Sequence, residues 1–334
     1  MRSVIFSLAI VLLVGLAKGS SYGHSLMEYK EGQRFFLFPD SNGKMHLVDS
    51  QQEGIESRFT AEQDTNLLLY TRKNPKVAQK IIFGDSNSLA GSNFDKSKDV
   101  KFIAHGWTDN GNTGVYSATL RDAFLAALDV NVVVYDWEVG AAGLYPVAVL
   151  NVSPAGEFLA KAVDWFVSQG TPIANVCLVG HSLGSHVVGI AGRSVTRGTV
   201  PNIMGLDPAM PLWGSTSKRL RSTDGAYVEV IHTNGGNLGL NEPCGDNDYY
   251  PNRGSSQPGC AFADFGCNHA RSWLFYAESL DITGYKAKQC TNYDEMNNKK
   301  CANLSDSYMG GSKVKPAAGI FYLETASDQP WYLG

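Results

Sequence analysis

The chain has 334 residues, of which 43% are hydrophobic and 18% are charged. This composition excludes intrinsic disorder, because disordered chains have few apolar residues and a high net charge. The 35 glycines follow no fixed period, which excludes a collagen-like array, and the formal net charge of −4 provides no basic surface for nucleic acid. We therefore expect a folded protein with a sizeable core, and an enzyme rather than a charged binding arm.

The N-terminal residues have the pattern of a secretory signal peptide. Arg2 precedes an apolar run over residues 4–17, and Ala17 and Gly19 have the spacing of a cleavage site. The run is too short to span a bilayer as a helix, so an uncleaved anchor is the weaker alternative. We expect removal of residues 1–19 from a secreted, extracellular protein. The net charge then becomes −6, because Arg2 and Lys18 are lost without any acidic residue.

Residues 20–60 mix a short aromatic run at 35–38 with scattered polar residues. Either an N-terminal extension packed on the core or a removable pro-segment fits this pattern. No linker or internal repeat follows, so we expect residues 61–334 to form a single domain.

From residue 66 onward, apolar strand-like runs alternate with amphipathic segments. Strands rich in Val and Ile that are separated by helical segments are typical of βα units. We therefore predict an α/β fold in which helices flank a mostly parallel central sheet. The predicted strands cover residues 66–71, 100–104, 130–135, 176–180, 202–206, 226–232 and 319–324. The predicted helices cover residues 116–128, 156–167, 183–196 and 268–280, and Pro154 is expected to break the helical pattern that follows Pro146.

The sharpest motif is Gly180-His181-Ser182-Leu183-Gly184, which lies between a predicted strand and a predicted helix. A sharp turn between strand and helix needs glycines where a side chain would clash, and it lifts the serine hydroxyl above the sheet edge. The N-terminus of the helix then faces the negative charge that develops during attack. An ordinary βα turn of small residues is the structural alternative, but the flanking strand and helix favour a nucleophile at Ser182.

A serine nucleophile needs a base that an acid orients, and on this kind of turn both follow the serine in the chain. Asp207 ends the strand at 202–206, at the sheet edge where α/β sites form, although an Asp-Pro pair also starts turns. Two histidines compete for the role of base. His232 ends a strand, whereas His269 lies two residues after Cys267 in a segment that a disulfide would fix. A loop position after the late strands favours His269 and leaves His232 a structural role.

An oxyanion hole needs two backbone N–H groups, one from the residue after the serine and one from an earlier strand-to-loop turn. Leu183 follows the serine. The strand at 100–104 runs into His105-Gly106-Trp107-Thr108-Asp109, in which Gly106 allows a close approach of the backbone. We therefore predict Trp107 and Leu183 as the two donors.

The six cysteines all lie in the second half of the chain. Secretion permits disulfides, although six cysteines allow fifteen pairings. Proximity in the sequence favours the pairs Cys260–Cys267 and Cys290–Cys301. Cys177 lies in an apolar strand, where a buried thiol is expected, and the state of Cys244 is left open. No His or Cys spacing is that of a zinc site, and we expect neither a metal nor another cofactor.

Together these motifs resemble the pancreatic lipase family of secreted α/β-hydrolases, in particular its insect neutral lipases and the insect venom phospholipases A1. The resemblance covers most of residues 60–330 and implies the α/β-hydrolase fold. It implies Ser182, Asp207 and His269 as a catalytic triad, which decides between the two histidines, and it implies Trp107 and Leu183 as oxyanion donors. The motifs that carry it are His105-Gly106-Trp107-Thr108-Asp109, the pentapeptide around Ser182, Gly205-Leu206-Asp207-Pro208-Ala209, Tyr250-Pro251-Asn252, Gln257-Pro258-Gly259-Cys260 and Cys267-Asn268-His269-Ala270-Arg271-Ser272.

The chain also departs from this family in two surface loops. In the lipases that it resembles, a lid spans the disulfide corresponding to Cys260–Cys267, but here only residues 261–266 lie between the cysteines. The segment 235–249 is also short for the second surface loop of triacylglycerol lipases. Both short loops resemble those of the phospholipase A1 branch, in which a less covered site admits a polar headgroup.

The resemblance also has implications for metals, partners and function. The calcium segment of vertebrate relatives corresponds to residues 216–224, where Asp224 is kept but Thr216 and Arg221 stand in place of acids, so we expect no calcium. No C-terminal β-sandwich follows residue 324, so we expect no colipase-type partner. The implied activity is hydrolysis of acylglycerols or glycerophospholipids at an oil–water, micelle or membrane interface. The alternative is a non-catalytic lipase-like protein that binds lipid or serves as a yolk-type store.

Overall fold

The computed structural model describes residues 29–282, 284–302 and 306–333. The signal peptide predicted over residues 1–19 therefore lies outside the described residues. The strands are β1 (Phe35–Pro39), β2 (Met45–Asp49), β3 (Asn66–Tyr70), β4 (Gln79–Ile81), β5 (Val100–Ala104), β6 (Asn131–Asp136), β7 (Val176–His181), β8 (Asn202–Leu206), β9 (Val228–Ile231), β10 (Asn247–Pro251), β11 (Tyr285–Cys290), β12 (Asp306–Met309) and β13 (Gly319–Leu323). The α-helices are α3 (Ala61–Asp64), α4 (Ser86–Ala90), α5 (Val115–Ala127), α6 (Glu138–Ala141), α7 (Tyr145–Ser168), α8 (Leu183–Ser194), α9 (Phe265–Ser279) and α10 (Tyr293–Asn297).

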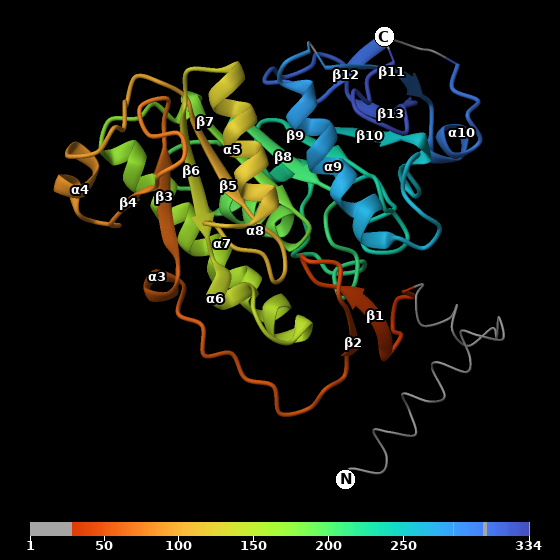
Figure 1. Cartoon of the computed structure of the whole chain (residues 1–334), viewed down its shortest axis with the longest axis horizontal. Helices are drawn as coiled ribbons and strands as arrows, with labels where there is room; N and C mark the ends of the chain where they lie inside the picture. Colours follow the sequence, from red (N-terminus) through yellow and green to blue (C-terminus); the bar gives the residue numbers. More distant parts are fainter. Residues whose placement is uncertain (1–28, 283, 303–305, 334) are drawn as a thin grey trace.

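One large sheet forms the centre of the molecule, with its strands in the order β12-β11-β13-β10-β9-β8-β7-β5-β6-β3-β4 (Figure 1). The strands from β13 to β6 run parallel to their neighbours. Antiparallel strands complete both edges. This mostly parallel sheet confirms the predicted α/β-hydrolase fold, and all seven predicted strands are present.

Helices cover both faces of the sheet, because successive side chains of the apolar strands point to opposite faces. Phe102 and Leu178 pack into the cluster that contains residues of α7 and α8. Their neighbours Ile103 and Val179 pack into the cluster that contains residues of α5 and α9. Strands β5, β7 and β8 are parallel neighbours, so their carboxyl ends lie together at one edge of the sheet, where α/β proteins form their sites.

Helix α7 corrects the expected break at Pro154. The helix runs without interruption from Tyr145 to Ser168, with Pro154 inside it. The missing N–H of proline removes one helical hydrogen bond. Val152, Ala155 and other residues on both sides of Pro154 are buried in the core, and this burial outweighs the loss. Neither α7 nor any other helix of the described ranges is long and apolar enough to cross a membrane.

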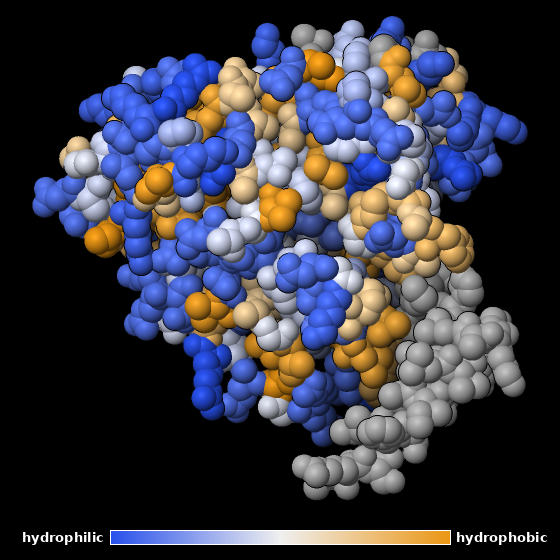
Figure 2. Space-filling view, in the orientation of Figure 1, coloured by the Kyte–Doolittle hydropathy of each residue, from blue (hydrophilic) through white to orange (hydrophobic). Residues whose placement is uncertain are grey.

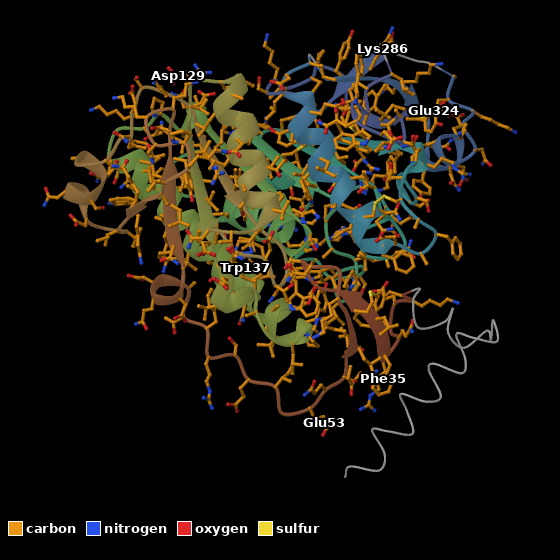
Figure 3. The ribbon with its side chains drawn as sticks, in the orientation of Figure 1. Phe35, Glu53, Asp129, Trp137, Lys286 and Glu324 are labelled. Atoms are coloured by element: carbon orange, nitrogen blue, oxygen red, sulfur yellow. A yellow bond between two sulfur atoms is a disulfide. The ribbon has the colours of Figure 1, made fainter. Side chains whose placement is uncertain are left out.

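The strands β1 and β2 form a separate antiparallel hairpin, which we call the N-terminal hairpin (residues 35–49). Its inner side chains Phe36, Phe38 and Val48 are buried in the core. The connection to α3, residues 50–60, is mostly exposed and runs along the outside of the molecule, where Figure 3 shows Glu53. The hairpin is thus joined to the sheet by packing as well as by this connection.

Both predicted disulfides are confirmed. Cys260–Cys267 and Cys290–Cys301 have Cα–Cα distances of 5.7 and 4.4 Å. Cys177 is a buried thiol, as predicted, and Cys244 is also a buried thiol. Burial raises the pKa of both thiols, which favours their protonated forms at neutral pH.

Candidate active site

Ser182 lies at the turn between β7 and α8 with φ 57° and ψ −123°, a backbone conformation that residues other than glycine rarely adopt. Glycines on both sides make this turn sterically possible. A Cβ on Gly180 would lie 2.2 Å from the backbone oxygen of Gly184, and a Cβ on Gly184 would lie 2.2 Å from the oxygen of Ala104. The pentapeptide thus forms the strained strand-to-helix turn that the sequence predicts, with Ser182 only 3% exposed.

Asp207 and His269 are joined by a short hydrogen bond. Asp207 is fully buried after β8, and its Oδ2 lies 2.5 Å from Nδ1 of His269. Its other oxygen, Oδ1, accepts from the backbone N–H groups of Thr233 and Asn234 at 2.8 and 3.1 Å. Because a carboxylate only accepts hydrogen bonds, Nδ1 of His269 is the donor in this pair. His269 lies inside helix α9, which begins at Phe265, three residues before the helix predicted over residues 268–280, so His269 is not on a loop.

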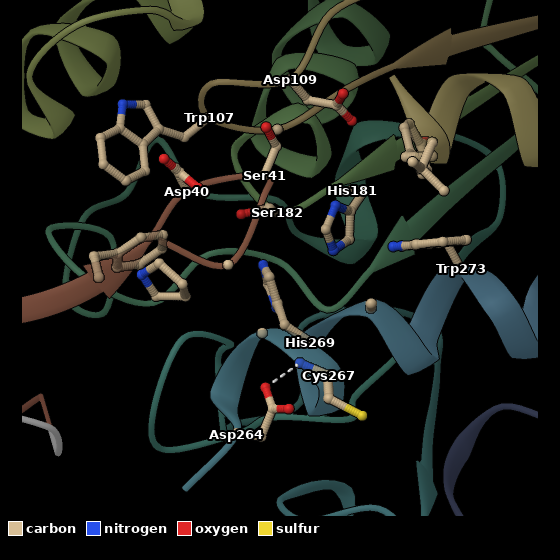
Figure 4. Close-up of a pocket in the computed structure, with 18 residues that line it drawn as sticks. Asp40, Ser41, Trp107, Asp109, His181, Ser182, Asp264, Cys267, His269 and Trp273 are labelled. Carbon is tan, nitrogen blue, oxygen red and sulfur yellow. Dashed lines mark hydrogen bonds between the residues drawn. The ribbon is translucent and has the colours of Figure 1, made fainter. Parts of the chain in front are cut away.

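Ser182 and His269 meet at one cavity of about 180 Å³. Its walls come from the oxyanion loop (residues 105–109), the turn of the N-terminal hairpin and the start of α9. Figure 4 shows the imidazole of His269 directed toward Ser182. Nε2 of His269 is buried without a hydrogen-bond partner among the described residues. No hydrogen bond therefore joins Ser182 to His269 in the part of the chain that the structure describes, and nucleophile–base bonds often form only when substrate binds.

The two predicted oxyanion donors adjoin Ser182. Leu183 is the first residue of α8, so its N–H has no acceptor within the helix. On the other side, Gly106 brings the oxyanion loop so close that a Cβ on it would lie 2.9 Å from Cβ of Ser182. The next residue, Trp107, is anchored by its indole, which donates to the backbone oxygen of Gly143 at 3.1 Å.

The sequence did not predict that His105 and Asp136 form a buried polar pair beneath the oxyanion loop. Nε2 of His105 lies 3.2 Å from Oδ1 of Asp136, and the indole of Trp137 donates to the backbone oxygen of His105 at 2.8 Å. Burial raises the pKa of Asp136, but the hydrogen bond and the charge of His105 outweigh it and lower the pKa to about 2. The signal was present in the sequence, because His105 follows β5 and Asp136 ends β6, its parallel neighbour.

His181 is a second residue whose position the sequence did not reveal. Its ring centroid lies 4.4 Å from that of His269 and 5.3 Å from that of Tyr116. Burial, followed by repulsion from the protonated form of His269, lowers the pKa of His181 well below its usual value. His181 therefore remains neutral beside the candidate base.

His232 does not line the cavity. Its Nε2 lies 2.9 Å from Asp248 and its Nδ1 lies 2.9 Å from the backbone oxygen of Leu240. Its ring stacks on Tyr250 at 4.3 Å. Cys244 completes a group of three possible metal ligands with His232 and Asp248, but both ring nitrogens already have partners. This geometry fits the structural role expected for His232.

The segment that corresponds to a calcium site is occupied by ion pairs. The buried carboxylate of Asp224 accepts from Arg193 at 2.6 and 2.8 Å and from Arg221 at 3.2 Å.

The two disulfides lie in different parts of the domain. Cys267 of the first disulfide lines the cavity, whereas Cys290 of the second lies with Met296 and Tyr322 in a separate cluster of buried residues.

Comparison of the whole chain with known proteins points to one family. A family model described as "Lipase" matches residues 32–331. Pancreatic triacylglycerol lipase of Myocastor coypus is 36% identical over 300 residues, which cover 78% of this chain and 65% of that protein. Lipase member H-A of Xenopus laevis is 37% identical over 240 residues, covering 68% and 52%. Pancreatic triacylglycerol lipase of Homo sapiens is 33% identical over 319 residues, covering 84% and 66%. The chain thus spans about half to two thirds of the length of these relatives.

Proposed function

The chain belongs to the lipase family, and on this premise we propose that it is a serine hydrolase that cleaves carboxylic esters of lipids. The observation that carries the proposal is the hydrogen bond between Asp207 and His269, together with the cavity that His269 and Ser182 both line. An acid that orients a histidine next to a strained serine turn is the arrangement that activates a serine nucleophile.

In the proposed reaction, Oγ of Ser182 attacks the ester carbonyl carbon while Nε2 of His269 accepts the hydroxyl proton. Asp207 holds the imidazole in the correct tautomer and stabilises its charged form. The N–H groups of Trp107 and Leu183 bind the negative charge on the former carbonyl oxygen. His269 then protonates the departing alcohol oxygen, and a water molecule hydrolyses the acyl-serine to release the fatty acid.

Within this class, the short segment between Cys260 and Cys267 (residues 261–266, the lid loop) favours glycerophospholipids over triacylglycerols, in the manner of a phospholipase A1. Helix α9 already begins at Phe265, so only residues 261–264 between the two cysteines lie outside it. The side chain of Asp264 caps this helix by accepting from the N–H of Cys267 at 2.9 Å, which shortens the loop further. A site with so small a cover admits a polar headgroup beside the ester.

Apolar side chains around the cavity support docking on a lipid surface. Phe262 of the lid loop is 87% exposed, and Val115, which lines the cavity, is 67% exposed. Figure 2 shows further apolar side chains over the N-terminal hairpin, where Phe35, Met45 and Leu47 are exposed. Because the net charge is negative, apolar contacts rather than attraction to anionic lipids would hold the protein at the interface.

The proposal includes secretion. Two disulfides fit an oxidising compartment, and the N-terminal sequence has the pattern of a signal peptide. The enzyme would therefore meet its lipid outside the cell.

The substrate is tested with vesicles of 1-palmitoyl-2-oleoyl-phosphatidylcholine and with emulsified triolein, and Ser182→Ala serves as the inactive control. We expect release of palmitate from the vesicles at a rate above that of oleate from triolein. Turnover of triolein without turnover of phospholipid would contradict the phospholipid preference. Absence of fatty acid release from both substrates would contradict the hydrolase function.

A further inference from the structure

The turn of the N-terminal hairpin is hydrogen-bonded to the oxyanion loop. The backbone N–H of Ser41 donates to Oγ1 of Thr108 at 2.8 Å, and the Ser41 hydroxyl donates to the backbone oxygen of Thr108 at 2.9 Å. Thr108 directly follows Trp107, so both bonds end one residue from the proposed oxyanion donor. Figure 4 shows Ser41 at the cavity with its hydroxyl pointing away from Ser182.

Thr108 has a conformation that needs support from its surroundings. Its φ of 57° lies in the left-handed region, which is unfavourable for a β-branched residue. Such a conformation persists only where neighbouring contacts hold it. Within the domain, the N–H of Thr108 donates to Ala141 at 3.0 Å, and its hydroxyl donates to the backbone oxygen of Trp107 at 2.7 Å. The two bonds from Ser41 add to these from outside the sheet.

The hairpin also contacts the side chain of Trp107. The ring centroids of Phe38 and His46 lie 5.5 and 5.4 Å from that of the indole, both in edge-on geometry. Tyr145 of α7 holds the same indole at 5.5 Å. The dipeptide Trp107-Thr108 is therefore held by the hairpin through both its side chains and its backbone.

We propose that the N-terminal hairpin is a positioning element for catalysis, in which Ser41 holds Thr108 so that the N–H of Trp107 stays directed at the oxyanion. This inference rests on the proposed hydrolase function. Ser41 does not contact the reacting atoms and acts only through the oxyanion loop. Loss of the hairpin would leave the triad in place but weaken the stabilisation of the transition state, so the hairpin belongs to the active protein and is not a removable pro-segment.

The test uses the full protein and p-nitrophenyl butyrate, a soluble ester that requires no lipid surface. Ser41→Ala and Thr108→Val each remove one or more bonds between hairpin and loop. Since one hydrogen bond contributes modestly, we expect kcat to fall about threefold to tenfold in each variant. KM should stay within about twofold, because the oxyanion contact forms mainly in the transition state. The inhibition constant of butylboronic acid, whose boronate oxygen occupies the oxyanion position, should rise by the same factor as kcat falls.

Two further variants separate positioning from a merely structural effect. Ser41→Thr keeps a hydroxyl and should restore most of kcat, while Asn42→Ala changes the same exposed turn without altering a bond to Thr108 and should leave kcat unchanged. Thermal unfolding of every variant checks that the fold is intact.

The failures of the two proposals are distinguishable by labelling with a fluorophosphonate. If the wild-type protein is labelled at Ser182, but Ser41→Ala and Thr108→Val both keep wild-type kcat and boronate affinity, the positioning role is overturned and the hydrolase function stands. If the wild-type protein is neither labelled nor active on the ester, the proposed function is overturned together with the role of the hairpin.

Discussion

The missing side chain of Gly106 sets the distance between the oxyanion loop and the nucleophile. Gly106→Ala should lower kcat about 10²-fold, because a Cβ 2.9 Å from Cβ of Ser182 must displace the loop and with it the proposed oxyanion donor, the N–H of Trp107. Gly266→Ala is the matched control, since Gly266 also lines the cavity but its Cβ would meet no atom closer than 3.7 Å. Steady-state kinetics on a soluble ester measures both variants. Equal kcat values for Gly106→Ala and Gly266→Ala would contradict the expectation that a side chain at Gly106 displaces the oxyanion loop.

The pair of His105 and Asp136 beneath that loop should make a pH-dependent contribution to stability. Because folding lowers the pKa of Asp136 from 3.8 to about 2, the contribution is present above pH 4 and is lost as the pH falls toward 2. Asp136→Asn should therefore lower the free energy of unfolding by about 2 kcal/mol at neutral pH, and by less in acid. Urea unfolding of wild type and variant at pH 7, 5 and 3 measures the difference. If the difference in unfolding free energy between wild type and variant stays constant down to pH 3, the lowered pKa of Asp136 is not its cause.

Sequence patterns predict a site residue only where a local motif surrounds it. Ser182 stands in a glycine turn, Asp207 at the end of an apolar strand and His269 just after a cysteine, so each could be singled out. Ser41 carries no such signal. Its contact with Thr108 arises because the hairpin folds over the carboxyl end of β5, and a contact between segments so far apart in the chain depends on the tertiary structure.

The strands of the sheet differ in how clearly the sequence marks them. The Val- and Ile-rich strands at the centre were predictable, because strands buried on both faces are continuously apolar. Strand β10, with the sequence Asn-Asp-Tyr-Tyr-Pro, was not predicted although it pairs with β9 and β13. Its Asp248 is buried with partners from other segments, because it binds His232 and accepts from the N–H of Cys244. Those partners become visible only in the folded chain.

The lid loop should act as a contact with lipid rather than as part of the reaction. Phe262→Ser should weaken binding to phosphatidylcholine vesicles by about tenfold to a hundredfold, because burying a phenylalanine side chain in lipid contributes on the order of 1.5–3 kcal/mol. Turnover of a soluble ester should not change. Val77→Ser is the control, since Val77 is 74% exposed in the loop between β3 and β4, at the far edge of the sheet. Vesicle sedimentation and initial rates measure the two effects, and an equal loss on the soluble ester would contradict this role.

At the scale of the whole molecule, one sheet edge assembles the candidate site from distant segments. The parallel strands β5, β7 and β8 end beside one another and carry the oxyanion loop, Ser182 and Asp207. Helix α9 adds His269 from beyond β10, and the N-terminal hairpin closes one wall of the cavity. Because the carboxyl ends of parallel strands lie at one edge of a sheet, the topology explains why the candidate site residues gather at this edge.

An activated serine reacts with a fluorophosphonate, so labelling with this probe shows whether Ser182 is the nucleophile. The folded wild-type protein, Ser182→Ala and His269→Ala are treated with the probe, and the modified peptide is identified by mass spectrometry. We predict an adduct on Ser182 of the wild-type protein, none at this position in Ser182→Ala and much slower labelling in His269→Ala. A folded wild-type protein without an adduct on Ser182 would contradict the role of Ser182 as nucleophile and favour a lipase-like protein that binds lipid without cleaving it.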